Sequence, residues 1–300
     1  MFEGSAVALV TPFLNGEVDE KKLAELVEFQ VVNGTSTLVP CGTTGESATL
    51  SHREHGRVID LAIQFSRKRV RVLAGAGSNA TREAVELTRH AKEAGADGVL
   101  HITPYYNKPT QRGLVEHFKA VARAADIPVI LYNVPSRTGV NMLPATVIEL
   151  ARSEKNIVGV KEASGVLDQA TEIAQALGDT FELLSGEDAL TLPILAVGGK
   201  GVISVAANII PKDIADLCSA AARGDWLEAR RLHLKMHNLC KTLFIETNPI
   251  PVKTVMGWLD LCSPDVRLPL VSMDKTNADK LEKVVRAYGL LATPRRHAGC

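Results

Sequence analysis

A lysine stands near the end of a short apolar run, NIVGVKE, over residues 156–162. In a strand the side chains alternate between two faces, so Ile157, Gly159 and Lys161 share one face and the two valines share the other. With the valines packed against helices, Lys161 points into the interior, and Gly159 beneath it leaves room for a substrate. Burial lowers the pKa of a lysine amine, and the neutral amine is a nucleophile toward carbonyl carbon. The alternative is a lysine with a buried stem whose charge pairs with Glu162 or another acid.

Three of the four tyrosines in the chain lie at the ends of two other apolar runs. Tyr105 and Tyr106 follow the run 98–103, and Tyr132 ends the run 129–132. A tyrosine hydroxyl beside a neutral amine can move protons during imine formation, although a tyrosine packed in the core is the usual alternative. Arg137 follows shortly afterwards, and a guanidinium there suits a carboxylate or phosphate substrate. An exposed loop arginine is the plain alternative.

A loop with paired glycines and threonines, CGTTGES over 41–47, follows the run 37–39. Glycines allow a tight turn that exposes backbone amides, and Thr43 and Thr44 supply hydroxyls that bind a carboxylate or relay a proton. An ordinary turn between strand and helix explains the loop equally well. Gly186, which follows the run 181–184, is expected to line the same site.

These residues stand where short apolar runs end, and the runs alternate with amphipathic stretches. Strand and helix in alternation predict a parallel sheet, and eight units in about 200 residues favour a (β/α)8 TIM barrel, whose reacting groups lie at the carboxyl ends of strands. A doubly wound open sheet is the alternative, but it has fewer strands, and its glycine-rich phosphate loops are missing here. The expected strands are 6–10, 37–39, 70–74, 98–103, 129–132, 157–161, 181–184 and 201–204, and the helices between them are 20–32, 51–64, 82–94, 111–124, 144–151, 166–177 and 189–197.

The pattern changes to helices alone after Pro211. Amphipathic stretches at 213–223, 226–244, 252–258 and 277–288 predict a C-terminal helical extension packed on the barrel. The sequence therefore divides into a barrel over 1–210 and an extension over 211–300.

The composition excludes several classes of function. The chain has 300 residues, with 34 Lys and Arg against 34 Asp and Glu, so its formal net charge is zero. Zero net charge gives no electrostatic footprint for nucleic acid or an anionic membrane. No apolar run is long enough for a membrane helix, and no basic segment precedes an apolar one at the N-terminus. We therefore expect a cytoplasmic protein without nucleic-acid or membrane partners.

Metal ligation is not expected. His233 and His237 are four residues apart on a predicted helix, but no acid or third ligand accompanies them, so a solvated helix face is the simpler interpretation. The cysteines are scattered and odd in number, which argues against a zinc site or a disulfide framework and for buried thiols in a reducing compartment. They are Cys41, Cys218, Cys240, Cys262 and Cys300, the last of which we expect on a mobile tail.

The motifs around these residues resemble the dihydrodipicolinate synthase family, which belongs to the pyruvate-dependent class I aldolases and lyases. The likeness runs from about residue 3 to residue 290 and rests on GTTGE at 42–46, PYY at 104–106, YNVPSRTG at 132–139, GVKEA at 159–163 and NPIPVK at 248–253. Relatives such as N-acetylneuraminate lyase share the lysine, the tyrosine and the threonine loop. Arg137 and the paired tyrosines favour the synthase over those relatives.

The resemblance implies a Schiff-base condensation of pyruvate with L-aspartate 4-semialdehyde, the first committed step of the diaminopimelate route to lysine. Lys161 forms the imine, and the relay of hydroxyls consists of Thr43, Tyr132 and Tyr106, the last donated by a neighbouring subunit. No metal or organic cofactor is implied. The residues implied to hold the substrates are Thr43, Thr44, Arg137, Gly186 and Ile203.

Two alternatives of different kinds remain beside this interpretation. One is another pyruvate-dependent lyase, such as a sialic acid or 2-keto-3-deoxy sugar aldolase, against which Arg137 argues. The other is a catalytically inactive barrel with a binding or regulatory role, against which the complete set of Lys161, Tyr132, Thr43 and Arg137 argues.

The resemblance also implies a homotetramer, built as a dimer of dimers, and feedback inhibition by L-lysine at the dimer interface. Independently, Ser51 and Glu54 have the spacing of a capping box, so a helix is expected to begin there. Ordinary solvated helix N-termini are the plain alternative for this cluster. The residues that match lysine-binding positions are Ser47, Ala48, His52, His55, Asn79, Glu83 and Tyr105.

Overall fold

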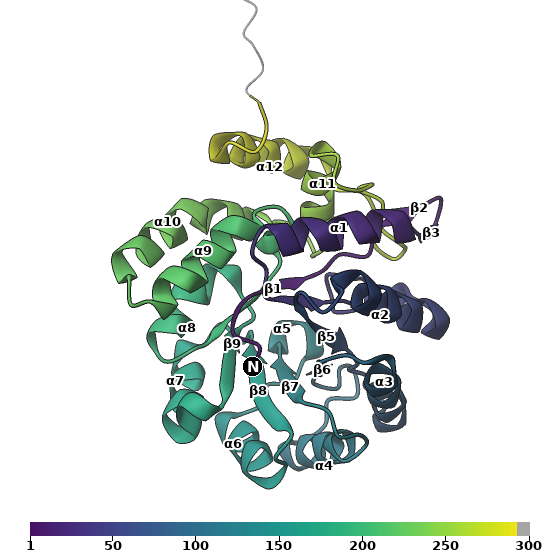
Figure 1. Ribbon diagram of the computed structural model, residues 1–300, viewed down its shortest axis with the longest axis vertical. Helices are drawn as coiled ribbons and strands as arrows, with labels where there is room; N and C mark the ends of the chain where they lie inside the picture. Colours follow the sequence, from purple (N-terminus) through teal and green to yellow (C-terminus); the bar gives the residue numbers. More distant parts are fainter. Residues whose placement is uncertain (293–300) are drawn as a thin grey trace, which may run out of the picture.

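The computed structural model describes residues 1–292, and the predicted tail position of Cys300 lies outside the described residues. Eight parallel strands close into a barrel in the order β1-β10-β9-β8-β7-β6-β5-β4, and helices surround it (Figure 1). The predicted (β/α)8 barrel is therefore confirmed. The barrel strands are β1 Gly4–Ala8, β4 Thr37–Val39, β5 Arg71–Gly75, β6 Gly98–Ile102, β7 Val129–Asn133, β8 Ile157–Glu162, β9 Glu182–Ser185 and β10 Gly201–Ser204.

The helices of the ring follow their strands in chain order. Most are amphipathic, and their apolar faces cover the outside of the barrel. They are α1 Glu20–Val32, α2 His52–Ser66, α3 Thr81–Ala94, α4 Gln111–Ala122, α6 Pro144–Ser153, α7 Leu167–Leu177, α8 Thr191–Ala196 and α9 Pro211–Ala222. The predicted capping box is present, because the Ser51 side chain accepts from Glu54 N and the Glu54 carboxylate accepts from Ser51 N.

Helix α9 packs against β1 and β10, so it occupies the eighth position of the ring. Helix α10 (Trp226–Thr242) packs on α9, and α12 (Lys275–Tyr288) packs on α10 and on α11 (Ile250–Trp258). The helices outside the ring thus begin at Trp226, and the division at residue 210 stays a prediction about folding units. Among residues 1–292, no helix is both long and apolar enough to span a bilayer.

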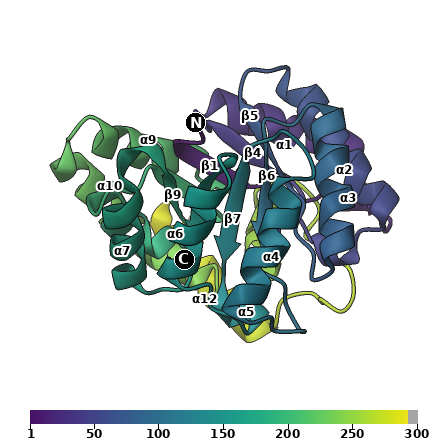
Figure 2. The ribbon, with the colours of Figure 1, turned by 90° about the horizontal axis from the view of Figure 1, so that it is seen from below.

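Several short elements lie at the ends of the barrel. The hairpin of β2 (Phe13–Leu14) and β3 (Glu17–Val18) was not expected from the sequence, nor was the short helix α5 (Pro135–Thr138). Figure 2 shows the arrow of β7 pointing to the end of the barrel where α5 and α12 lie, with the N-terminus at the opposite end. The remaining pieces are the 3-10 turns η1 Ser47–Thr49, η2 Gly178–Thr180, η3 Asp188–Leu190 and η4 Ala206–Asn208.

The strand that carries Lys161 contains an irregularity. Val129 of β7 pairs with Ile157, but Ile130 pairs with Gly159, so Val158 is an extra residue in β8. This bulge breaks the alternation. Ile157 therefore faces the outer core, while Val158 packs against the cluster inside the barrel.

The predicted partition of faces was thus correct from Gly159 onward and wrong for the two residues before it. Val160 lies in the outer core, which leaves Lys161 facing inward. The space at Gly159 is not available to a substrate, however. A β-carbon there would lie 2.7 Å from Ile130 Cδ1 and 2.5 Å from the Glu182 carbonyl oxygen, so neighbouring atoms already fill that volume.

Candidate active site

The amine of Lys161 lies buried beside the ring of Tyr132. These two residues are register partners on β7 and β8, and Lys161 Nζ is 4.2 Å from the centre of the tyrosine ring. Within residues 1–292, Nζ makes no hydrogen bond or ion pair. Burial lowers the pKa of Lys161 to about 7; the field of Asp188 opposes that shift and the field of Arg137 adds to it. A substantial fraction of the amine is therefore neutral near neutral pH.

The alternative of a lysine paired with Glu162 is wrong. The Glu162 carboxylate accepts hydrogen bonds from Asn133 Nδ2 at 3.1 Å and from Ser164 N at 2.6 Å. Burial raises the pKa of Glu162, while these two donors lower it. The carboxylate is thus held by neutral donors and leaves the amine without a counter-ion from this residue.

Hydroxyls and a guanidinium surround one cavity at the carboxyl ends of the strands. The cavity has a volume of about 500 Å³, and Thr43, Tyr132 and Arg137 all line it. Burial raises the pKa of Tyr132 to about 12, against the fields and hydrogen bonding of Arg137 and Thr43, which lower it. The Tyr132 hydroxyl therefore stays protonated and can donate. Thr44 is buried next to the cavity, where its Oγ1 accepts from Asn248 Nδ2 at 2.9 Å.

Gly186 and Ile203 lie deeper in the same end of the barrel. A β-carbon on Gly186 would lie 3.2 Å from Lys161 Cε and 2.6 Å from Ala163 Cβ, so only glycine fits beside the lysine stem. Ile203 is buried in the interior cluster that also contains Tyr132. Both residues therefore shape the surroundings of the amine, although neither lines the large cavity.

Tyr106 is not brought to Lys161 within one chain. Its side chain is 91% exposed, and its φ of +71° holds the turn after β6 in a left-handed conformation. Tyr105 instead lines the cavity and is 38% exposed. The two adjacent tyrosines thus face different surroundings.

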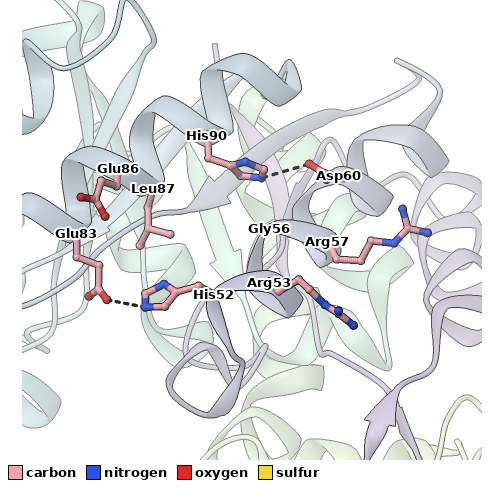
Figure 3. A pocket seen from close by; sticks show the side chains of 9 residues that line it. All are labelled: His52, Arg53, Gly56, Arg57, Asp60, Glu83, Glu86, Leu87 and His90. Atoms are coloured by element: carbon pink, nitrogen blue, oxygen red, sulfur yellow. Dashed lines mark ion pairs between the residues drawn. The ribbon is translucent and has the colours of Figure 1, made fainter.

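The predicted lysine-binding residues come together at the outer part of the same cavity. Most of them line it, and Asn79 adjoins them by donating from Nδ2 to the Tyr105 carbonyl oxygen at 3.2 Å. His52 Nε2 lies 3.3 Å from Glu83 Oε1, and Figure 3 shows these side chains pointing toward each other from α2 and α3. The cavity-lining members are Ser47, Ala48, His52, His55, Glu83 and Tyr105.

The two histidines of this cluster differ in burial. His52 has a side chain that is 80% exposed, whereas His55 is buried and its Nδ1 has no hydrogen-bond partner within residues 1–292. Burial lowers the pKa of His55 to about 4, so its ring is neutral near neutral pH. A second groove between α2 and α3 continues from His52 and Glu83 to the pair His90–Asp60, also 3.3 Å apart (Figure 3).

Asp188 is a residue near the amine that the sequence analysis missed. It is buried in η3, and its carboxylate accepts from the Ser204 hydroxyl, from Val205 N at 3.0 Å and from Ala206 N at 3.1 Å. Burial raises the pKa of Asp188, while these donors and the Lys161 amine lower it. Asp188 comes near Lys161 because it follows β9, which pairs with β8, and no local sequence motif marks this contact.

Metal ligation finds no support in the part of the chain that the structure describes, where no group of three or more His, Cys, Asp or Glu side chains is arranged to hold an ion. The rings of His233 and His237 lie 6.0 Å apart, and His237 is exposed. The four described cysteines are free and buried, as expected from the sequence.

A buried lysine amine without a counter-ion, beside a tyrosine ring at the carboxyl end of a (β/α)8 barrel, is the arrangement of enzymes that form an imine with a carbonyl substrate. The sequence profile of the dihydrodipicolinate synthetase family matches residues 1–288. The chain belongs to this family, which confirms the resemblance found in the motifs and the prediction that it is an enzyme of the lyase class.

Individual relatives are similar over nearly the whole chain. The 4-hydroxy-tetrahydrodipicolinate synthase of Geobacter sulfurreducens is 59% identical, over 97% of this chain and 100% of that protein. The crystal structure of the chloride-inhibited dihydrodipicolinate synthase of Acinetobacter baumannii complexed with pyruvate is 43% identical, with a TM-score of 0.95 over 97% of this chain and 100% of that one. The enzyme of Cyanidioschyzon merolae with lysine bound is 43% identical, with a TM-score of 0.94 over 97% and 99%.

Proposed function

We propose that this chain acts as a 4-hydroxy-tetrahydrodipicolinate synthase, which condenses pyruvate with L-aspartate 4-semialdehyde on the way to diaminopimelate and lysine. The observation that carries the proposal is the buried Lys161 amine, which lies 4.2 Å from the ring centre of the cavity-lining Tyr132 and has no ion pair within residues 1–292. A cytoplasmic location fits this reaction.

The amine begins the reaction on the keto carbon of pyruvate. Lys161 Nζ attacks that carbon, water leaves, and a protonated imine forms. The imine withdraws electrons, so the methyl group loses a proton and an enamine results. The enamine carbon attacks the aldehyde of the second substrate, and the amino group of that substrate then displaces Lys161 as the ring closes. No metal or organic cofactor is required, because the amine itself supplies the carbonyl chemistry.

The surrounding side chains move protons and hold charges. Tyr132 and Thr43 pass protons to and from the intermediates, a contribution typically worth about 10²–10⁴-fold in rate. Thr43 and Thr44 hold the pyruvate carboxylate, Arg137 holds the carboxylate of the semialdehyde, and Gly186 and Ile203 complete the walls around the imine. Arg137 favours this second substrate over the sugar aldehydes that other pyruvate lyases accept.

Borohydride reduction tests the proposal directly. Treatment with borohydride in the presence of pyruvate is expected to add the mass of a reduced pyruvyl group to the peptide that contains Lys161. Label on another lysine, or no label, contradicts imine formation at this position. Assays with aspartate semialdehyde against sialic acid and keto-deoxy sugars then separate the synthase from other pyruvate lyases, because only the first is expected to turn over.

The exposure of Tyr106 supports a homotetramer arranged as a dimer of dimers. A tyrosine that is 91% exposed in one chain can offer its hydroxyl to the relay of a neighbouring subunit. Tyr106→Phe is then expected to lower kcat while the fold and assembly stay intact. A fully active monomer in sedimentation at assay concentration contradicts the arrangement.

The outer part of the cavity supports a regulatory site for L-lysine. Glu83 offers a carboxylate for an ammonium group, and His52, His55 and Asn79 offer donors for a carboxylate. Coupling between such sites is typically worth about 1–3 kcal/mol, so inhibition is expected to be partial. Millimolar lysine is expected to inhibit the wild type and to lose most of its effect on Glu83→Ala, and a wild type that ignores lysine contradicts the site.

A further inference from the structure

The loop that carries Thr43 and Thr44 has little regular structure of its own. It connects β4 to η1 and contains two backbone hydrogen bonds between residues close in sequence. Glu46 N donates to the Thr43 carbonyl at 3.1 Å, and Ser47 N donates to the Gly42 carbonyl at 3.3 Å. Glu46 has a φ of +53°, a left-handed conformation that non-glycine residues seldom adopt. Other parts of the chain must therefore hold this conformation.

The strongest external contact is a buried ion pair from the helices outside the barrel ring. Lys253 Nζ on α11 lies 2.7 Å from Glu46 Oε1, and both side chains are completely buried. The same amine donates to the Thr11 carbonyl at 3.0 Å and lies 4.3 Å from the centre of the Phe13 ring. Lys253 thus joins the segment after β1 to the loop after β4.

Three further hydrogen bonds fix the same loop. Asn248 Nδ2 donates to Thr44 Oγ1 at 2.9 Å, the Thr11 hydroxyl donates to the Gly45 carbonyl at 2.7 Å, and Arg267 N donates to Glu46 Oε2 at 3.0 Å. Two of these donors come from the region after α10, more than 200 residues away in sequence. The helical extension is therefore part of the framework of the threonine loop.

We propose that Lys253 is a positioning residue that acts through Glu46 to hold Thr43 and Thr44 where the pyruvate carboxylate and the Tyr132 hydroxyl meet them. The Lys253 side chain is completely buried and its amine already contacts Glu46 and the Thr11 carbonyl, so it does not touch the substrate. A hydrogen-bonded charge pair fixes both distance and direction, which an apolar contact of equal size would not do. This inference rests on the proposed function, because the placement matters only if the two threonines serve pyruvate.

The test compares Lys253→Met and Glu46→Gln with the wild type in steady-state kinetics and thermal unfolding. Each variant is expected to raise the KM for pyruvate about tenfold and to lower kcat by a smaller factor. The pH dependence set by Lys161 is expected to stay unchanged, because that residue lies on β8 and not on the loop. An unchanged KM in a folded variant overturns the proposal.

The double variant Glu46→Gln/Lys253→Met separates positioning from stability. Removing both charges leaves neither one buried alone, so the thermal midpoint is expected to recover relative to the single variants. The KM for pyruvate is expected to stay raised, since glutamine and methionine cannot rebuild the directional contact. A KM that recovers together with the midpoint shows a merely structural role and overturns the inference.

Two more variants cover the remaining outcomes. Thr11→Val has almost the same shape and leaves no buried charge, so it is expected to fold even if Lys253→Met does not, with a rise in pyruvate KM of about threefold. An unchanged KM for pyruvate in Thr11→Val contradicts the view that these hydrogen bonds position the loop of Thr43 and Thr44. Glu182→Gln is the matched control, because Glu182 is buried at the other end of the barrel, where it accepts from Phe2 N at 2.7 Å.

Glu182→Gln is expected to lower the thermal midpoint and to leave the KM for pyruvate unchanged. A rise in KM equal to that of Lys253→Met would show that any loss of stability moves this constant, which overturns the assignment. Borohydride labelling of Lys161 in the wild type tests the proposed function separately, so failure there is distinguishable from failure of the positioning role.

Discussion

Two buried lysines in this molecule each lie close to an aromatic ring, but their electrostatic surroundings are opposite. Lys161 on β8 lies 4.2 Å from the centre of the Tyr132 ring, and Lys253 on α11 lies 4.3 Å from the centre of the Phe13 ring. Lys253 has a carboxylate at 2.7 Å, whereas within residues 1–292 Lys161 has neither an ion pair nor a hydrogen bond.

This difference explains why Lys253 has a structural role and Lys161 can act as a nucleophile. Burial lowers the pKa of both amines, but the Glu46 carboxylate beside Lys253 opposes the shift through both its charge and a hydrogen bond. Among the described residues, Lys161 has no carboxylate in contact, and burial lowers its pKa to about 7 against the field of Asp188. A buried amine is thus reactive when its counter-charge is kept at a distance and structural when a carboxylate contacts it.

Removing the Lys161 amine is expected to have the largest effect on activity. Lys161→Ala should lower kcat/KM by about 10³-fold or more, as loss of a covalent nucleophile does elsewhere, while substrate positioning leaves some residual rate. Steady-state kinetics with both substrates measure this loss. Activity within tenfold of the wild type would show that the reaction does not pass through this amine.

Replacement of each lysine by methionine is expected to change stability in opposite directions. Lys253→Met leaves Glu46 buried without its partner and should lower the free energy of unfolding by about 3–5 kcal/mol. Lys161→Met removes a buried amine that has no counter-ion and should raise the same free energy by about 1–2 kcal/mol. Denaturant titrations of both variants check the contrast, and equal destabilisation by the two substitutions would refute it.

The smallest of the expected effects is on the pH dependence of kcat/KM. Because the neutral amine attacks and the pKa of Lys161 is about 7, kcat/KM for pyruvate should rise about tenfold per pH unit below 7 and level off above it. The field of Asp188 raises this pKa, so Asp188→Asn should move the rising limb to lower pH. Initial rates across this range test both statements. A rising limb that stays in place in Asp188→Asn would show that Asp188 does not influence the pKa of Lys161.

Most of the fold was predictable because barrel strands and ring helices have strong local signals. The expected helix over 20–32 coincides with α1, and the expected strands over 37–39 and 201–204 coincide with β4 and β10. The hairpin β2–β3 has strands of only two residues, too short for an alternation to register. The bulge in β8 also escaped prediction, because the extra residue is another valine in an apolar run.

The chemistry of the candidate site was readable wherever the residue type itself is unusual for its place. A lysine at the end of an apolar strand and tyrosines at strand ends favour a carbonyl-directed site from sequence alone, since a lysine is seldom fully buried and barrel chemistry lies at strand ends. The motifs of the family added the identities of the substrates to that interpretation.

Tertiary structure alone decided which charges meet. Glu46 and Lys253 were visible only as parts of two motifs, and Asp188 was not singled out. Each of these side chains contacts a partner that is distant in sequence. Asp188 accepts from Ser204, 16 positions away, and Glu46 accepts from Lys253, 207 positions away. The pKa of a buried group depends on distances to charges that the packing of strands and helices sets, and a sequence specifies those distances only through the complete fold.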